Sequence, residues 1–218
     1  MSEHNAAAGS ESLTGTVEAD FPEYAAPPSE PIGLLRRWLE HAVTVGVREP
    51  RALALATADA QGRPSSRTVV LNRLTETGLV FATHDGSRKE RELRDNAWAS
   101  GLLYWRETSR QVAVRGPVRR LSAADADALW ASRPPFTHAM TAASRQSRPL
   151  DGLDDVAELR ARADQLAAAG PLPRPERYIG LELVPEEIEF WANGSGRLHE
   201  RLRYDRTAEG WRTVRLAP

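Results

Sequence analysis

Residues Ser65–Leu74 read SSRTVVLNRL, and the fold prediction starts from the pattern in this stretch. Side chains of a β-strand point alternately to its two faces, so one face here carries Arg67, Val69 and Leu71. The other face carries the alternate residues Thr68, Val70 and Asn72. Arg67 taken alone is a surface charge, but an arginine that faces a barrel interior or an interface needs an anionic partner. Both interpretations of Arg67 stay open at this point.

Short strand-like segments continue on both sides of this stretch. RALALATA (51–58) precedes it and is stopped by the turn cluster DAQGRP, and LVFATH (79–84) follows a turn that ends at Gly78. Further candidate strands are ASGLLYW, QVAVRGPVRRL, YIGLELV, EIEFWANG, RLRYDR and WRTVRL, the last two joined by TAEG. The chain therefore contains about eight strands, mostly joined by short turns.

Helical patterns are inserted between groups of these strands. Ser29 is the expected N-cap of a first helix with Pro31 in its first turn. Its apolar residues recur at helical spacing and are Leu34, Leu35, Trp38, Leu39, Ala42 and Val43. Ser122 is expected to cap a helix that runs to Trp130, and another helix is expected over about 153–169, before Gly170.

The order of these segments favours one fold class. Because helices do not alternate regularly with strands, a doubly wound parallel sheet is disfavoured. We expect a mainly β fold, a closed or partly open antiparallel barrel with peripheral helices. Residues 1–28 are rich in Ser, Ala, Glu and Pro without apolar periodicity, which predicts a partly disordered arm. Residues 29–218 then form a single domain.

Composition limits the kinds of function. The 218 residues carry a net charge of −1, so a general nucleic-acid or membrane-surface binder is disfavoured and any anion site must be local. The absence of cysteine excludes disulfides, thiolate metal sites and cysteine nucleophiles, and favours a reducing cytoplasm. No apolar run suits a membrane span, the first residues lack a signal-peptide pattern, and the five histidines lack metal-ligand spacing.

The stretch DGSRKEREL (85–93) places positive charge at an unusual position. It predicts a turn, Ser87 as N-cap and a helix whose first turn carries Arg88 and Lys89, where the helix dipole favours acidic residues. Lys89 is also the only lysine of the chain. A bound phosphate would neutralise both cations at the helix start. The alternative is a solvated helix end paired with Glu90 or Glu92.

A third cluster lies near the C-terminus, in EFWANGSGRLHERLRYDR. Trp191 ends one expected strand, and Arg197, His199, Arg201 and Arg203 alternate along the next. This stripe is either an edge strand protected by charge or a surface for an anionic, planar ligand against Trp191. The chain has no nucleophile elbow, no P-loop and no dinucleotide-binding glycine motif, so hydrolytic and nucleoside-triphosphate chemistry lack support.

In combination, SRTVVLN, GSRKERE, RQVAVRG, SRQS, EFW and RLHERLRYDR resemble the pyridoxine 5′-phosphate oxidase family over roughly residues 29–218. This resemblance implies an FMN-binding split barrel that works as a homodimer with FMN at the subunit interface. The blocks ESLTGT, REPRALALATAD, ASGLLYWRETS and LHERLRYDR are closer to the family's phenazine-biosynthesis branch. That likeness implies an oxidase that takes partly reduced phenazine carboxylates to aromatic products, with O2 as electron acceptor and hydrogen peroxide as by-product.

The resemblance also assigns roles to residues. The implied FMN contacts are Arg67, Thr68, Val69, Val70, Leu71, Asn72, Ala82, Thr83, Ser87, Arg88, Lys89, Gln111, Gln146, Ser147, Trp191 and Arg201. The implied substrate contacts are Asn72, Leu129, Arg133, Thr137, Arg197, Leu198 and His199. Of these, Arg197 and His199 orient the substrate for catalysis, and His199 is the candidate acid–base group. The N-terminal residues Glu11 to Thr16 are a candidate flap over the substrate.

Departures from the vitamin-processing members concern the substrate. Those members carry Lys, Tyr and Ser where this chain has Asn72, Leu129 and Thr137, so a charged donor and a phenol for the substrate phosphate are missing. A lost charge-assisted contact costs about 1.5–3 kcal/mol. We therefore expect a phenazine carboxylate as substrate. The alternatives are a pyridoxine or pyridoxamine 5′-phosphate oxidase, or a split-barrel protein that binds flavin or haem without turnover.

Overall fold

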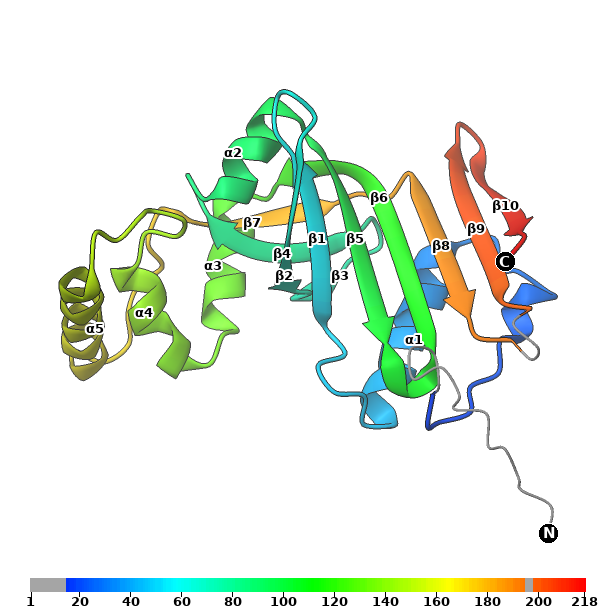
Figure 1. Ribbon diagram of the computed structural model, residues 1–218, viewed down its shortest axis with the longest axis horizontal. Helices are drawn as coiled ribbons and strands as arrows, with labels where there is room; N and C mark the ends of the chain where they lie inside the picture. Colours follow the sequence, from blue (N-terminus) through cyan, green and yellow to red (C-terminus); the bar gives the residue numbers. More distant parts are fainter. Residues whose placement is uncertain (1–14, 195–197) are drawn as a thin grey trace, which may run out of the picture. The chain divides into compact units, whose positions relative to one another are not determined.

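The computed structural model describes residues 15–194 and 198–218 (Figure 1). Contacts between Cα atoms divide the chain into two compact units, each described here by itself. Unit 1 comprises Met1–Ala54, Ser100–Arg115 and Pro185–Pro218, and unit 2 comprises Leu55–Ala99 and Gly116–Val184. The division into an arm (1–28) and a single domain (29–218) stays a prediction.

Ten strands form one antiparallel sheet, so the expected mainly β, antiparallel class is confirmed. The strands are β1 Ala52–Ala58, β2 Pro64–Val70, β3 Arg73–Leu74, β4 Leu79–His84, β5 Trp98–Trp105, β6 Arg110–Arg120, β7 Tyr178–Leu183, β8 Glu187–Ala192, β9 Glu200–Thr207 and β10 Gly210–Leu216. The hydrogen-bonded order is β10-β9-β8-β6-β5-β1-β2, with β7 joining β6 to β4 and β4 pairing with β3. Within the described residues no pairing closes the sheet into a complete barrel.

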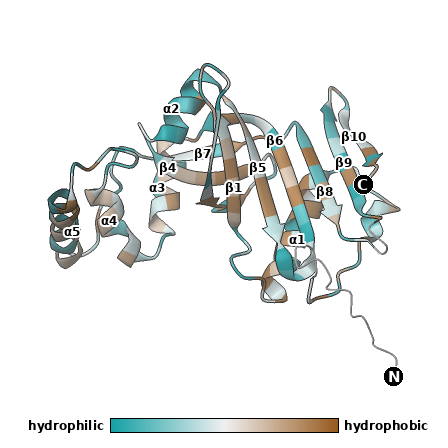
Figure 2. Cartoon of the chain, viewed as in Figure 1, coloured by the Kyte–Doolittle hydropathy of each residue, from teal (hydrophilic) through white to brown (hydrophobic). Residues whose placement is uncertain are grey.

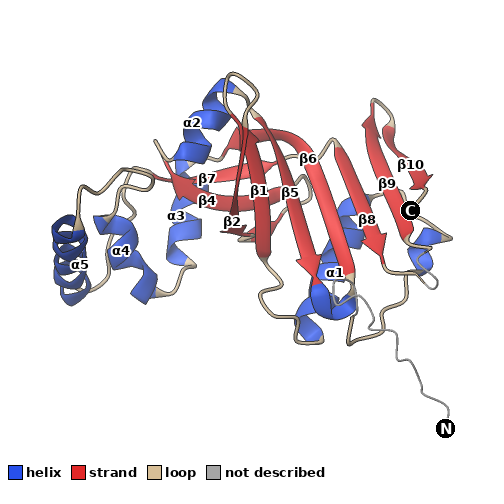
Figure 3. Cartoon of the chain, viewed as in Figure 1, coloured by secondary structure: helices blue, strands red, loops and turns tan. Residues whose placement is uncertain are grey.

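Helices precede the first strand and fill several of the connections between strands (Figure 3). They are α1 Pro31–Thr44, α2 Arg88–Asp95, α3 Ala123–Ala131, α4 His138–Ala143 and α5 Leu153–Ala168, with short 3₁₀ turns η1 Pro22–Tyr24, η2 Arg106–Thr108 and η3 Pro135–Thr137. Of these, α2 to α5 all belong to unit 2. None of the helices in the described part of the chain has the length and apolar character needed to cross a membrane.

Unit 1 is built around Trp38 of α1. Its ring makes edge contacts with Phe190 of β8 and with Phe21, at centroid distances of 5.2 and 4.7 Å. The guanidinium of Arg110 lies 4.2 Å above the same ring. The helix was predicted correctly, but its N-cap position is Glu30 and not Ser29, because Pro31 fixes the helix start one residue later.

The chain before α1 is attached to unit 1. The amides of Thr16 and Val17 donate to the Glu107 carbonyl, and Arg110 donates to the Asp20 carbonyl. Phe21 is buried. Of the predicted arm, residues 15–28 therefore follow the surface of unit 1, whereas most of the predicted flap, Glu11 to Thr14, lies outside the described residues.

Two expectations for the cluster at 197–203 were wrong. β9 begins at Glu200, so His199 precedes the strand instead of alternating along it. β9 also lies between β8 and β10, so it is not an edge strand. Its arginines are paired with acids: Arg201 Nε lies 2.7 Å from Glu189, and Arg203 Nε lies 2.8 Å from Asp205. Local charge pairing, which alternation does not reveal, accounts for Arg201 and Arg203, whereas Arg197 lies outside the described residues.

Phe21→Ala is expected to lower the free energy of unfolding by about 3 kcal/mol, because it removes a buried ring that packs against Trp38. Chemical denaturation monitored by tryptophan fluorescence measures this loss. Val43→Ala is the matched control, since Val43 was predicted on the apolar face of α1 but is 51% exposed. If Phe21→Ala and Val43→Ala lower the free energy of unfolding by the same small amount, packing of Phe21 against Trp38 does not stabilise unit 1.

Candidate functional site

A cavity of about 640 Å³ opens in unit 2 beside β2 and the start of α2. Its size is in the range of small-molecule sites. Ser65, Ser66, Arg67, Thr68, Val69, Val70, Asn72, Ala82, Arg88, Lys89, Arg133, Pro134, Thr137, Gln146, Ser147 and Tyr178 line it. We call it the cationic cavity. Its β2 wall follows the predicted alternation, since Ser65, Arg67 and Val69 are half-buried while their neighbours are exposed.

Four cations line the cationic cavity, and none of its lining residues is acidic. They are Arg67, Arg88, Lys89 and Arg133. Among the described residues, neither Lys89 nor Arg133 has a carboxylate within ion-pair distance. A concentration of like charge beside a cavity favours an anionic ligand, because the ligand supplies the missing counter-charge. The chain as a whole is nearly neutral, so this positive region is local, as expected.

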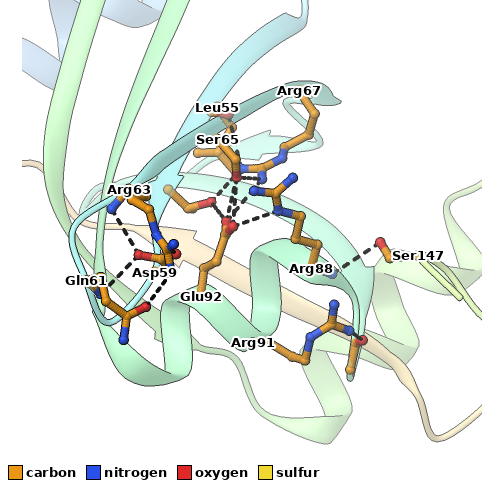
Figure 4. A network of polar contacts seen from close by, with 12 residues as sticks. Leu55, Asp59, Gln61, Arg63, Ser65, Arg67, Arg88, Arg91, Glu92 and Ser147 are labelled. Carbon is orange, nitrogen blue, oxygen red and sulfur yellow. Dashed lines mark hydrogen bonds and ion pairs between the residues drawn. The ribbon is translucent and has the colours of Figure 1, made fainter.

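Glu92 of α2 organises two of these cations (Figure 4). Its carboxylate accepts hydrogen bonds from Thr57 Oγ1 at 2.5 Å, from Ser65 Oγ at 2.7 Å, from Arg67 Nη2 at 3.2 Å and from Arg88 Nε at 2.9 Å. Burial raises the pKa of this carboxyl, but the four donors outweigh burial and lower its pKa to about 2. Glu92 therefore stays ionised and fixes the two guanidinium groups.

Lys89 differs from its neighbour Arg88. The Arg88 side chain is 62% exposed and pairs with Glu92, as the solvated-helix interpretation expected. Lys89 is 6% exposed, and its Nζ donates to Thr83 Oγ1 at 3.2 Å and Gln146 Oε1 at 3.0 Å. Burial lowers the pKa of the Lys89 ammonium to about 8, Arg67 acts in the same direction, and Glu92 opposes them. The solvated-helix interpretation therefore fails for Lys89.

A loop after α4 closes the site over the start of α2. The Arg88 amide donates to Ser147 Oγ at 3.1 Å, and Ser147 adopts a left-handed backbone with φ +69°. Ser87 is at the N-cap position as predicted, but its side chain does not cap α2, because its hydroxyl lies 3.0 Å from Thr83 Oγ1. Figure 2 shows α2 as strongly hydrophilic, so polar contacts rather than apolar packing hold its start in place.

His84 supports this loop from β4. Its Nδ1 accepts a hydrogen bond from the Gln146 amide at 3.3 Å, which requires the ring nitrogen to be unprotonated. Burial lowers the pKa of His84 to about 4, and Arg177, Arg133 and Lys89 act in the same direction. A neutral His84 therefore fixes the loop without adding charge to the site.

Arg133 is held by hydroxyl groups instead of acids. Its Nε donates to Thr137 Oγ1 at 3.1 Å and its Nη2 to Thr141 Oγ1 at 2.9 Å. Its guanidinium lies 5.2 Å from the ring of Tyr178, whose buried hydroxyl has no hydrogen-bond partner among the described residues. A smaller cavity of about 240 Å³ shares Arg133 and Tyr178 with the cationic cavity. These donors suit a carboxylate or a phosphate.

Comparison with known proteins shows the family of the chain. The family model described as "Pyridoxamine 5'-phosphate oxidase" matches residues 39–192, and the model "Pyridoxine 5'-phosphate oxidase C-terminal dimerisation region" matches residues 178–218. The chain belongs to the pyridoxamine 5′-phosphate oxidase family. The resemblance found in the sequence, including the likeness to its phenazine-biosynthesis branch, is confirmed.

Relatives within the pyridoxamine 5′-phosphate oxidase family carry two kinds of name. A dihydrophenazinedicarboxylate synthase from Pseudomonas chlororaphis is 58% identical over 96% of this chain and 93% of its own. A pyridoxine/pyridoxamine 5′-phosphate oxidase from Rubrobacter xylanophilus is 42% identical over 92% of each chain. The crystal structure of PhzG from Burkholderia lata 383 in complex with tetrahydrophenazine-1-carboxylic acid has a TM-score of 0.89 and 50% identity, covering 94% of this chain and 100% of that chain.

Most residues to which the family resemblance assigned FMN contacts line the cationic cavity. Those that do are Arg67, Thr68, Val69, Val70, Asn72, Ala82, Arg88, Lys89, Gln146 and Ser147, and the assigned substrate residues Arg133 and Thr137 join them. Thr83 lines the smaller cavity. Ser87 and Leu71 are fully buried outside the lining, and Leu129 packs with Val80, Trp130 and Tyr178 in the core.

The remaining assigned residues belong to unit 1. Gln111, Trp191 and Arg201 are direct partners across β6, β8 and β9, so they form one row on adjacent strands. The His199 ring lies 4.8 Å from the Trp191 ring, and its buried Nδ1 has no hydrogen-bond partner among the described residues. Leu198 is 70% exposed, and Arg197 lies outside the described residues.

Apart from Glu92, the residues that hold the guanidinium groups of Arg67 and Arg88 could not be identified from the sequence. Thr57 and Ser65 lie on neighbouring strands and reach Glu92 only after folding, so no sequence spacing connects them. Tyr178 and Pro134 complete the lining without any motif. No cluster of three acidic or histidine side chains suited to a metal ion occurs in the described part of the chain.

His84→Gln is expected to make stability less dependent on pH. Because folding lowers the His84 pKa from 6.5 to about 4, the unfolded chain binds more protons between these values. The wild-type free energy of unfolding therefore falls by up to about 1.4 kcal/mol per pH unit from this group as pH drops from 6.5. Denaturant unfolding of both proteins at pH 7.5 and 5 measures the difference. If the difference in free energy of unfolding between the wild type and His84→Gln is the same at both pH values, His84 does not have a lowered pKa in the folded protein.

Proposed function

We propose that the chain is an FMN-dependent oxidase of phenazine biosynthesis that oxidises a partly reduced phenazine carboxylate with O2 as electron acceptor. The observation that carries this proposal is the cationic cavity, in which four cations meet no acidic lining residue. The relatives named dihydrophenazinedicarboxylate synthase and the complex of PhzG with tetrahydrophenazine-1-carboxylic acid support the choice of substrate.

The residues of the cavity fit the FMN phosphate. Arg67, Arg88 and Lys89 provide charge for a phosphate dianion, and the start of α2 adds backbone amides. FMN held by these residues would supply the redox chemistry, in which a hydride from the substrate would be taken up and its electrons passed on to O2, giving hydrogen peroxide. Further proposed contacts are Thr68, Val69, Val70, Leu71, Asn72, Ala82, Thr83, Ser87, Gln146 and Ser147 in unit 2, and Gln111, Trp191 and Arg201 in unit 1.

Arg133 is the proposed partner of a substrate carboxylate. Hydroxyl groups of Thr137 and Thr141 position its guanidinium without neutralising it, which leaves its charge for the ligand. Asn72 lines the same cavity and offers an amide but no charge. In unit 1, His199 and Arg197 are proposed to orient the substrate. The remaining proposed substrate contacts are Leu198 of unit 1 and Leu129 of unit 2. Since the dimerisation-region model matches residues 178–218, we propose that the enzyme is a homodimer.

A second candidate function is the oxidation of pyridoxine or pyridoxamine 5′-phosphate. Arg133 with its Thr137 partner, able to hold a phosphate, favours it, as do relatives of that name at about 40% identity. Against it, Asn72 provides no charge, and the buried Leu129 provides no hydroxyl. A carboxylate needs fewer charge-assisted contacts than a phosphate dianion, so the phenazine carboxylate is preferred.

Anaerobic reduction of the flavin-loaded protein distinguishes these functions. Dihydro- or hexahydrophenazine carboxylates are expected to bleach the flavin spectrum much faster than pyridoxine 5′-phosphate, and admission of O2 is expected to restore it with release of hydrogen peroxide. A pyridoxine 5′-phosphate rate equal to or above the phenazine rate would support the second candidate. Flavin that no substrate reduces would indicate a protein that binds flavin without turnover.

Lys89→Ala is expected to raise the Kd for FMN by at least about tenfold and to leave the Kd for riboflavin within about twofold, because only FMN has the phosphate. Quenching of flavin fluorescence on titration with apoprotein measures both constants. Arg91→Ala is the control, since Arg91 lies on the same helix and its guanidinium donates to the Gly86 carbonyl outside the cavity. Equal FMN affinity in both variants would return Lys89 to a structural role.

A further inference from the structure

The cations of the cationic cavity do not offer equal numbers of free donors. An arginine has five N–H groups. The two Nη groups of Arg67 donate to the Leu55 carbonyl, Thr57 Oγ1, Ser65 Oγ and Glu92, so only its Nε–H lacks a partner among the described residues. Arg88 uses Nε for Glu92, and both of its Nη groups lack a partner within that part of the chain.

This difference follows from the position of Glu92. The carboxylate lies behind the two arginines, is 7% exposed and is not a lining residue of the cavity. Thr57 and Ser65 occupy further lone pairs of its two oxygens, and Thr57 also accepts from Arg67. Glu92 thus has little capacity to accept another hydrogen bond. Its contact with Nε of Arg88 leaves the two Nη groups of Arg88 available to a ligand.

We propose that Glu92 is a positioning residue for the ligand phosphate: it acts through Arg67 and Arg88, fixing Arg67 as a support and presenting the Nη groups of Arg88 to the phosphate. This inference rests on the proposed function, because it concerns the same phosphate site. In this arrangement Arg88 and Lys89 make most of the direct contacts with the phosphate, and Arg67 makes fewer.

A carboxylate near a phosphate site also repels the phosphate, so two effects of opposite sign compete. The gain from holding Arg67 and Arg88 in place outweighs the repulsion between Glu92 and the phosphate. Glu92 is held behind the arginines, and its charge already balances one of three clustered cations. Without this charge, Arg67, Arg88 and Lys89 repel one another with no compensation. The exposed Arg88 side chain then loses the ion pair that orients it.

Glu92 also affects the charge of Lys89. The groups around the Lys89 ammonium are Arg67 from β2, Glu92 from α2, neutral His84 and Thr83 from β4, and Gln146 from the loop after α4. Of the charged groups, only Glu92 favours the protonated amine. Removal of its charge therefore lowers the pKa of Lys89 below its present value of about 8. As the pH rises, Lys89 without the Glu92 charge would lose its proton, and with it phosphate affinity, at a lower pH than in the wild type.

Glu92→Gln tests this inference because it removes the charge and keeps the size of the side chain. At pH 8 the Kd for FMN is expected to rise at least about tenfold, with the Kd for riboflavin within about twofold. As the pH is raised, FMN affinity is expected to decrease in both proteins, because Lys89 loses its proton. This decrease is expected to begin at a lower pH in the variant than in the wild type. Unchanged or tighter FMN binding in the variant would overturn the positioning role.

Glu182→Gln is the matched control. Glu182 is 1% exposed in the same unit and accepts from Thr75, Thr77 and Arg119, but it does not line the cavity. This change is expected to reduce stability and to leave the preference for FMN over riboflavin and the pH profile unchanged. An equal loss of FMN preference in Glu182→Gln would show that any buried glutamate has this effect, which overturns the specific role of Glu92.

Thr57→Val covers the case in which Glu92→Gln does not fold. It removes the hydroxyl that bridges Glu92 and Arg67 and preserves the shape of the side chain. Several-fold weaker FMN binding with unchanged riboflavin binding supports the inference, and unchanged FMN binding overturns it. A wild-type protein that binds riboflavin as tightly as FMN would instead overturn the phosphate site of the proposed function.

Discussion

The candidate site depends on one ion cluster, in which the buried carboxylate of Glu92 faces Arg67 and Arg88. This contact joins β1 through Thr57, β2 through Ser65 and Arg67, and α2 through Arg88. Buried like charges are unfavourable without such a partner. Because one carboxylate serves several cations, the cluster keeps an excess of positive charge, and this excess is what an anionic ligand neutralises.

The same balance explains the solitary lysine. Lys89 is almost fully buried, and two oxygen atoms accept from its compact ammonium, whereas Arg88 on the exposed side pairs with a carboxylate. A guanidinium has five N–H donors, more than the two acceptors that contact the Lys89 ammonium. A lysine also loses its proton more readily when buried, so the site gains a sensitivity to pH that an arginine would not give.

The strands, most helix starts and most cavity residues could be predicted from the sequence, because these depend on local pattern and on family motifs. Prediction failed where the outcome depends on contacts between distant segments. One of the two interpretations of the stripe at 197–203 was an edge strand protected by charge, yet β10 pairs with β9 and Glu189 pairs with Arg201. The short α4, which precedes the loop carrying Gln146 and Ser147, has too few residues for a periodic signal.

A crystal structure of the FMN complex would show whether the cationic cavity of unit 2 binds the FMN phosphate. We expect a phosphate within hydrogen-bond distance of Lys89 Nζ and of the Nη groups of Arg88, with Glu92 still hydrogen-bonded to Arg67. A phosphate bound away from these residues, with the cavity filled by solvent or by substrate alone, would contradict this expectation.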